Sequence, residues 1–221
     1  MKAIAINGSP RKNGKTTVLL EKVLQGLRTK GASTELINLY DKSYKGCISC
    51  FACKKSNNKC NGVCGYIDGL TPVLKKIMES DYLVLGMPIL VGSVNGYVRA
   101  FLERLIFPNL SYKNGKPVYT GKIKFSFVLT MDVGNNQADY SDYRAIFSHN
   151  HYLINLLSPK SAVLVSFNSK KFKNYSDFHK QVLEADFDND NTSETEEFKN
   201  DCSKAYEVGV LAAKEFMLKE N

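Results

Sequence analysis

Cysteines are the residues of this chain that cluster most sharply. The chain has six, and five of them lie between positions 47 and 64, while Cys202 stands far downstream. Cys47, Cys50 and Cys53 follow one another at three-residue steps, so their thiolates can turn toward one centre and hold an iron–sulfur cluster. Structural zinc more often uses two separated cysteine pairs. The clustering therefore favours metal or redox chemistry over a disulfide framework.

A fourth thiolate could come from Cys60 or from Cys64. We predict Cys60, because a six-residue arm of Asn, Lys and Ser is flexible enough to bring it back to the other three. Cys64 has a longer arm and lies close to the next predicted helix. The predicted metal ligands are thus Cys47, Cys50, Cys53 and Cys60. Metal-free thiols, a disulfide and zinc stay open as alternatives to a [4Fe–4S] cluster.

A second group of chemically active residues follows the first short apolar run, where positions 8–17 read GSPRKNGKTT. A loop between a strand and a helix presents free backbone N–H groups at the positive end of the helix. Together with Ser and Thr hydroxyls, Arg11 and Lys15, these groups suit a phosphate. The spacing argues against a P-loop, because five residues separate Gly8 from Gly14 where that motif needs four.

A third segment, 86–96, reads GMPILVGSVNG. A strand that ends at a proline and continues into apolar and small residues makes a flat apolar ledge. The backbone N–H groups of Gly92 and Ser93 lie at its edge, which suits a planar ring with polar atoms on its rim. A packed connection between a strand and a helix is the alternative for this segment.

Alternating strands and helices must position these motifs. Apolar periodicity predicts strands at 2–7, 33–39, 82–87, 122–130 and 161–167, and helices at 16–30, 71–79, 94–107, 140–157 and 195–218. Strands separated by helices form an open parallel α/β sheet, for which we expect the doubly wound order 2-1-3-4-5. Ligands bind such sheets at the carboxyl ends of the strands. We expect one domain over 1–221, with excursions at 44–66 and 168–194.

Charge and hydropathy indicate which classes of protein can be excluded. The net charge is +8, but residues 1–60 hold twelve Lys and Arg against three Asp and Glu, whereas residues 181–221 hold four against eleven. The basic part suggests an anionic ligand or partner, and the acidic part argues against uniform nucleic-acid binding. No apolar run reaches the roughly 18 residues of a membrane span, and no signal peptide is visible. We therefore expect a cytoplasmic protein that binds neither nucleic acid nor membrane.

Taken in series, these motifs resemble the NADPH-dependent FMN reductase family of flavodoxin-like proteins. The resemblance rests on GSPRKNGKTT, on the Pro-x-x-x-Gly-Ser segment that begins at Pro88, and on RAFLER at 99–104. It extends as a pattern over residues 1–130. The cysteine loop is similar to that of the iron–sulfur flavoprotein branch of the family.

The resemblance implies a flavodoxin-like fold and non-covalent FMN that is reduced by NADH or NADPH. It implies phosphate contacts from Ser9, Arg11, Asn13, Thr16 and Thr17, with Lys15 beside them. It implies that the flavin ring is lined by Pro88, Ile89, Leu90, Gly92 and Ser93, with Thr130 and Met131 on the third side. Family members commonly form a homodimer or homotetramer, and the basic segment suits a small acidic electron carrier.

Two other functions stay open at this stage. One is a non-enzymatic metal- or redox-sensing module built on the cysteine loop. The other is a nucleotide-binding enzyme of the phosphate-loop type, against which the glycine spacing already argues. Because the flavin carries the organic chemistry, no side chain is predicted to act as a catalytic acid or base.

Overall fold

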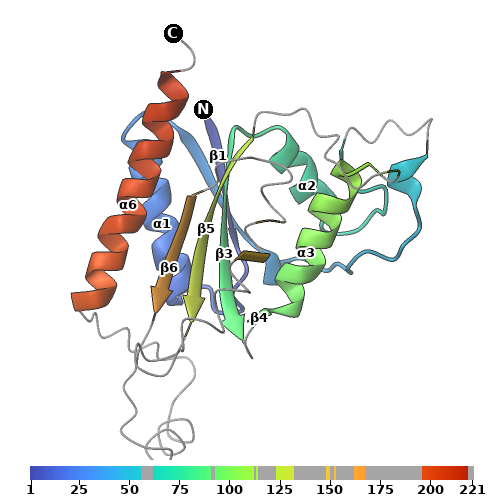
Figure 1. The fold of residues 1–221 in the computed structure, drawn as a ribbon, viewed down its shortest axis with the longest axis horizontal. Coiled ribbons are helices and arrows are strands. Elements are labelled where there is room, and N and C mark those ends of the chain that lie inside the picture. Colours follow the sequence, from blue (N-terminus) through green and yellow to red (C-terminus); the bar gives the residue numbers. More distant parts are fainter. Residues whose placement is uncertain are drawn as a thin grey trace, which may run out of the picture.

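The computed structural model describes residues 1–55, 62–90, 93–111, 113, 123–131, 148–149, 152, 162–167 and 196–218. In this part of the chain, five parallel strands form one sheet in the order β2-β1-β3-β5-β6, and a short strand, β4, pairs antiparallel with β3 (Figure 1). The strands are β1 (Lys2–Asn7), β2 (Ser33–Asn38), β3 (Tyr82–Leu90), β4 (Ser93–Val94), β5 (Lys124–Met131) and β6 (Ala162–Phe167).

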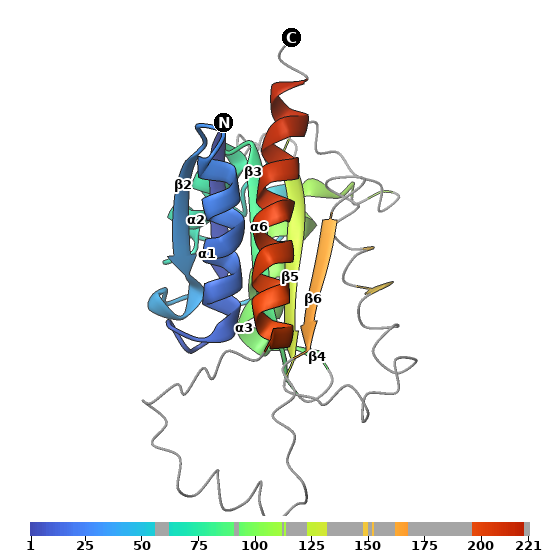
Figure 2. The same cartoon turned by 90° about the vertical axis from the view of Figure 1, so that its left-hand side faces the viewer.

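Helices cover both faces of the sheet, as predicted. On one face, α1 and α6 lie side by side, and on the other face lie α2 and α3 (Figures 1 and 2). The bounds are α1 (Lys15–Arg28), α2 (Thr71–Met78), α3 (Gly96–Ile106) and α6 (Glu196–Met217), with short 3-10 turns η1 (Leu39–Asp41), η2 (Ala52–Lys54) and η3 (Phe107–Asn109).

Each face of the sheet carries its own apolar core. On β1, Ile4 and Ile6 face the core beneath α2 and α3, and Ala3 and Ala5 face the core beneath α1 and α6. A strand buried on both faces needs such an unbroken apolar run. The α1–α6 pair packs closely, since a Cβ on Gly209 would lie 2.0 Å from the carbonyl oxygen of Val23.

The prediction for β3 was wrong at its end. The strand continues through Pro88 to Leu90 and turns back into β4. The register opposite β1 ends at Gly86, so Pro88 has a strand neighbour, β5, on one side only. A missing N–H is tolerated at such an edge position.

Leu70 is the N-cap of α2, and Thr71 is the first residue of the helix. The polar stretch 168–194 and almost all of the predicted helix at 140–157 lie outside the described residues. Among the helices that the structure describes, none has the length and apolarity that a membrane crossing requires.

Candidate functional site

The loop between β1 and α1, residues 8–14, crosses the edge of the sheet where the strands end. Gly8 begins this β1–α1 loop, and its N–H donates to the carbonyl of Gly86 at 2.9 Å. A Cβ on Gly8 would lie 2.2 Å from Cγ2 of Val98 and 2.6 Å from the Gly86 oxygen. Glycine is therefore required for the loop to pass so close to β3 and α3.

Two asparagines hold the β1–α1 loop in shape. Oδ1 of Asn7 accepts the N–H of Ser9 at 3.0 Å, and Nδ2 of Asn95 donates to the carbonyl of Gly8 at 2.7 Å. Oγ of Ser9 in turn accepts the N–H of Arg11 at 3.2 Å. Asn95 is also the N-cap of α3. The loop is thus ordered by groups of the protein itself.

The N-terminus of α1 opens onto this loop. Its N-cap residue, Gly14, has no side chain that could accept a hydrogen bond from the first turn, and that turn holds no acidic residue. First-turn N–H groups have no acceptor within a helix, and the helix dipole favours an anion there. Of the residues expected at the phosphate, Arg11 and Asn13 are exposed, and Lys15 and Thr17 are half-buried.

Two lysines beside the loop make contacts within the protein. Nζ of Lys12 lies 2.8 Å from Oδ1 of Asp41 in η1, and this hydrogen bond lowers the pKa of the Asp41 carboxyl. Nζ of Lys15 lies 5.5 Å from the centre of the Phe198 ring on α6. Lys12 thus contacts η1, and Lys15 contacts α6.

Thr16 and Thr130 are brought together although 114 positions separate them. Their hydroxyl oxygens lie 2.8 Å apart, and both residues are buried. The pair links the first turn of α1 to the end of β5. Thr17 differs from Thr16, because it is half-buried and its hydroxyl donates to the Arg11 carbonyl at 3.4 Å.

The predicted apolar ledge is a hairpin between β3 and β4. Leu90 and Ser93 are exposed on it, Pro88 is half-buried, and the side chain of Ile89 lies in the core beneath α2 and α3. Met131 is also a core residue. Gly92 lies outside the described residues. The end of β3 stands at the same edge of the sheet as the β1–α1 loop (Figure 1).

Residues 44–66 form the cysteine loop, and its described parts, 44–55 and 62–66, lie on the outer side of α3, away from the sheet (Figure 1). A hollow of about 330 Å³, including space open to solvent, lies between this loop and the second half of α3. Its lining includes four thiols, those of Cys47, Cys50, Cys53 and Cys64. The structure thus brings three predicted ligands together with Cys64. Cys60 lies outside the described residues.

The backbone around Cys50 takes an unusual course. Ser49 and Phe51, which flank it, have φ values of 54° and 53°, in the left-handed region that residues with a Cβ seldom adopt. Such a conformation costs about 1–3 kcal/mol per residue and is found where a site requires it. The strained residues are consistent with a loop shaped for binding.

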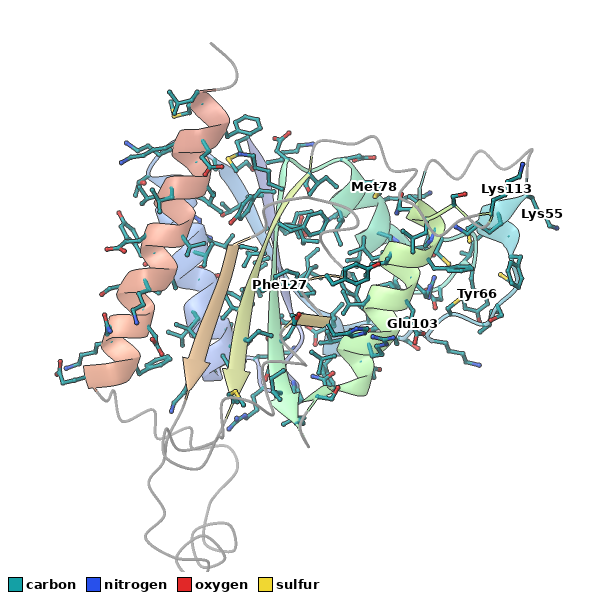
Figure 3. The ribbon with its side chains drawn as sticks, viewed as in Figure 1. Lys55, Tyr66, Met78, Glu103, Lys113 and Phe127 are labelled. Atoms are coloured by element: carbon teal, nitrogen blue, oxygen red, sulfur yellow. The ribbon has the colours of Figure 1, made fainter. Side chains whose placement is uncertain are left out.

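Arg104 of α3 anchors the cysteine loop at both ends. Its guanidinium donates to the carbonyls of Lys45 at 3.1 Å and Tyr66 at 2.6 Å, and pairs with Oδ2 of Asp68 at 2.5 Å. It also stacks over the Tyr66 ring at 5.2 Å. Figure 3 labels Tyr66 and Glu103, which mark the side of α3 that carries the loop.

Two further side chains fasten the loop to the end of α3. Nζ of Lys54 donates to the carbonyls of Phe107 and Leu110, which follow the helix. Nδ2 of Asn109 donates to the carbonyl of Gly62 at 2.9 Å, two residues before Cys64. These bonds hold the two arms of the loop on either side of the hollow.

The charges around the hollow perturb one another. Burial raises the pKa of the Cys53 thiol, although Lys54 beside it acts in the opposite direction. Burial would raise the pKa of Asp68 too, but hydrogen bonds from Arg104 and from the N–H groups of Leu70 and Lys45 hold it below its usual value. The carboxylate of Asp68 is therefore ionised at neutral pH.

The donor set of the hollow fits an iron–sulfur cluster. In the described ranges, no three side chains of His, Cys, Asp or Glu are placed to hold a single metal ion. Cysteines of a four-iron cluster bind separate irons, so their sulfurs need not meet at one point. Four thiols in the lining, with the cations Arg104 and Lys54 nearby, suit such a group.

Sequence reasoning missed the residues that hold the cysteine loop, namely Arg104, Asp68, Lys54 and Asn109. Arg104 entered the sequence analysis only as the last residue of the RAFLER motif. A usable signal was present, since an arginine at 104 shares a helix with the buried residues Phe101 and Leu105. A charge at such a position indicates a buried ion pair.

The fold is shared by two oxidoreductases of known structure. An FMN-dependent NADH-azoreductase from Bacillus anthracis, solved in complex with FMN, has a TM-score of 0.64 at 13% identity, covering 96% of this chain and 100% of that chain. An NAD(P)H:quinone oxidoreductase from Methanothermobacter marburgensis has a TM-score of 0.62 at 12% identity, covering 95% and 96%. Parallel sheet, helices on both faces and these neighbours define a flavodoxin-like fold.

Residues 1–153 match the NADPH-dependent FMN reductase family, and the chain belongs to this family. An iron-sulfur flavoprotein from Methanocaldococcus jannaschii is 38% identical over 104 residues, which are 47% of this chain and 51% of the relative. Another from Archaeoglobus fulgidus is 34% identical over 142 residues, 64% of each chain. The matched segments thus span between half and two thirds of these relatives.

Proposed function

We propose that this chain is an FMN-dependent oxidoreductase that takes electrons from NADH or NADPH. The observation that carries the proposal is the N-terminus of α1, which has no side-chain cap in the described part of the chain and opens onto a preformed loop at the ligand-binding edge of the sheet. Membership of the NADPH-dependent FMN reductase family supports it. When bound, FMN supplies hydride acceptance from the nicotinamide and electron transfer to an acceptor.

The residues of the β1–α1 loop would bind the phosphate of FMN. Ser9 shapes the loop, while the exposed Arg11 and the half-buried Thr17 lie beside the start of α1, where an anion would bind. The proposed phosphate set is Ser9, Arg11, Asn13, Lys15, Thr16 and Thr17. Within it, we assign Thr16 an indirect role, because its hydroxyl pairs with that of Thr130.

The β3–β4 hairpin would form the ring site. The exposed Leu90 and Ser93 can contact a planar ring, while Ile89 is limited to backbone contacts because its side chain is in the core. The proposed ring set is Pro88, Ile89, Leu90, Gly92, Ser93, Thr130 and Met131.

We also propose an electron-transferring iron–sulfur cluster in the cysteine loop, held by Cys47, Cys50, Cys53 and, from the spacing in the sequence, Cys60. Relatives that carry the name iron-sulfur flavoprotein support this, and so does the thiol lining of the hollow. The two sites share α3, because Asn95 contacts the β1–α1 loop and Arg104 the cysteine loop. Nine residues of helix separate them by roughly 14 Å.

The proposed setting is a cytoplasmic homodimer or homotetramer that passes electrons to a small acidic carrier. The basic segment 1–60 supports the choice of an acidic partner. Lys45 and Lys55, both exposed, lie within the cysteine loop and would contribute to such a contact.

Identification of the bound flavin tests the main proposal. The protein is purified, incubated with FMN and with FAD in separate samples, desalted and denatured, and the released flavin is identified by chromatography. We expect retention of FMN and its reduction on addition of NADH or NADPH. Retention of FAD alone, or of neither flavin, would contradict the proposal, and iron uptake without any flavin would favour a redox-sensing module instead.

Iron and sulfide analysis after anaerobic purification tests the cluster separately. Single changes to Ser at positions 47, 50, 53 and 60 should abolish its visible absorbance. Cys202→Ser on α6 is the matched control, since this cysteine is packed against the core beneath α1 and α6. Wild-type protein without iron would remove the cluster from the proposal and leave the flavin site untouched.

A further inference from the structure

Arg104 is the one charged residue that is buried in the described part of the chain, with 1% of its surface exposed. A buried arginine is stable only when its charge and its N–H groups find partners. Burial would lower its pKa, but the Asp68 carboxylate and the neighbouring Cys64 thiol hold the pKa of Arg104 above its usual value. The side chain is therefore a permanent positive charge behind the thiols.

The three nitrogen atoms of the guanidinium differ in the hydrogen bonds that they donate. Nη1 donates to the carbonyl of Lys45 and to Asp68, and Nη2 donates to the carbonyl of Tyr66. Nε is buried and forms no hydrogen bond of ordinary geometry among the described residues, although the guanidinium also contacts the Cys64 thiol. A buried donor without a partner costs about 1–3 kcal/mol, so its retention needs an explanation.

The position of Arg104 supplies that explanation. The residue lines the same hollow as Cys47, Cys50, Cys53 and Cys64. Thiolates and sulfides are hydrogen-bond acceptors and carry negative charge. A cluster in the hollow would therefore accept the remaining hydrogen bond of the guanidinium and offset its positive charge. Lysine is a poor substitute, because it lacks the planar fork that bonds two carbonyls and a carboxylate at once.

We propose that Arg104 is the positioning residue of the cysteine site: it holds both ends of the cysteine loop around the hollow and directs its remaining donor and its charge toward a bound iron–sulfur cluster. This inference rests on the proposed cluster for its electrostatic part only. The positioning part concerns the loop in the metal-free protein and stands on the bonds to Lys45 and Tyr66.

The positioning part is tested on metal-free protein by timed alkylation with iodoacetamide and mass spectrometry. In the wild type, the half-buried Cys64 should react more slowly than the exposed Cys50. Arg104→Lys should raise the rate at Cys64 toward that of Cys50. Arg28→Lys is the matched control, since Arg28 lies on α1 and makes only exposed contacts to Glu21 and Thr34. An unchanged rate at Cys64 in Arg104→Lys overturns the inference.

The electrostatic part is tested on protein reconstituted with iron and sulfide. Arg104→Lys should lose the cluster about tenfold faster or more, as is typical when a residue supporting metal ligands is changed. Asp68→Asn keeps an oxygen acceptor for Arg104 but removes the negative charge, so the reduction potential of the cluster should rise. A purely structural role of the Arg104–Asp68 pair would leave that potential unchanged, and this result overturns the electrostatic part.

The two proposals fail in different ways. Wild-type protein that takes up no iron contradicts the cluster, and the alkylation rates still decide whether Arg104 positions the loop. Protein that binds iron equally well with arginine or lysine at 104, at an unchanged potential in Asp68→Asn, contradicts the inference about Arg104 and leaves the cluster standing.

Discussion

The β1–α1 loop and the cysteine loop are held in place by different kinds of contact. In the first, backbone groups and the neutral amides of Asn7 and Asn95 make the bonds, and Gly8 lies directly against β3. In the second, the charged side chains of Arg104 and Lys54 reach across 36 to 59 positions of the chain to hold backbone carbonyls and Asp68.

The two loops should therefore respond differently to amino-acid substitutions and to pH. Neutral, tightly packed contacts depend on shape, so the β1–α1 loop should be sensitive to added volume and insensitive to pH. Buried charges depend on their partners, so the cysteine loop should be sensitive to the loss of one charge. Substitutions in each loop test this difference in sensitivity.

The largest effect is expected for Arg104→Met. It removes a wholly buried cation, leaves the mostly buried Asp68 carboxylate without its partner, and frees two carbonyls. We expect a loss of about 3 kcal/mol in the free energy of unfolding, measured by urea denaturation. Arg28→Met, on the exposed face of α1, should cost far less. Equal losses for the two variants would mean that the pair does not hold the cysteine loop.

Gly8→Ala should have the next largest effect. Its methyl group would lie 2.2 Å from Val98 Cγ2 and 2.6 Å from the Gly86 carbonyl oxygen, and the latter is backbone that cannot move aside. We expect a loss of about 1–3 kcal/mol by the same measurement. Gly96→Ala is the control, because nothing lies within 4 Å of a Cβ there. A tolerated Gly8→Ala would show that the β1–α1 loop is not held by shape.

Thr17→Val should weaken FMN binding with little effect on stability. It removes a half-buried hydroxyl at the start of α1. A hydrogen bond to a charged phosphate contributes about 1.5 kcal/mol, so we expect about a tenfold rise in the dissociation constant by fluorescence titration. Thr29→Val, at the other end of α1, should leave it unchanged. Thr16→Val should instead lower the unfolding midpoint, since it breaks the pair with Thr130.

The acid dependence of stability distinguishes the two regions further. The pKa of Asp68 is lower in the folded protein than in the unfolded chain, where a carboxyl titrates near about 4. Its contribution is therefore present above that pH and is lost as the pH falls through the lowered, folded value. In Asp68→Asn, the unfolding midpoint should decrease less steeply than in the wild type as the pH falls below about 4. Glu21→Gln, in an exposed pair, should not.

Lys12→Ala should have the smallest effect. Its ion pair with Asp41 is exposed, with 60% and 40% of the two side chains accessible. Exposed pairs often contribute nothing measurable. We expect an unfolding midpoint equal to that of Lys22→Ala within error. A clear loss would show that a surface charge also helps to order the β1–α1 loop.

Much of the scaffold could be predicted from the sequence. The short apolar run of β1, the helical periodicity of α1 and the glycines after β1 are local signals, and each predicted its element within a few residues. The parallel sheet followed, because strands separated by helices need crossover connections. The end of β3 was mispredicted, since Pro88 reads as a strand terminator unless the one-sided pairing at that point is known.

The chemically active groups can be read from the amino-acid sequence: three cysteines at three-residue steps, and a loop of glycines and hydroxyls between a strand and a helix. The residues that support these groups become visible in the folded chain. The Thr16–Thr130 pair joins residues 114 positions apart, and Arg104 meets Lys45 and Asp68 across 59 and 36 positions. The reason is the separation along the chain over which each kind of interaction acts. Turn and helix preferences act between neighbours in the chain, whereas the partner of a buried hydroxyl or charge is chosen by packing between elements that no local pattern specifies.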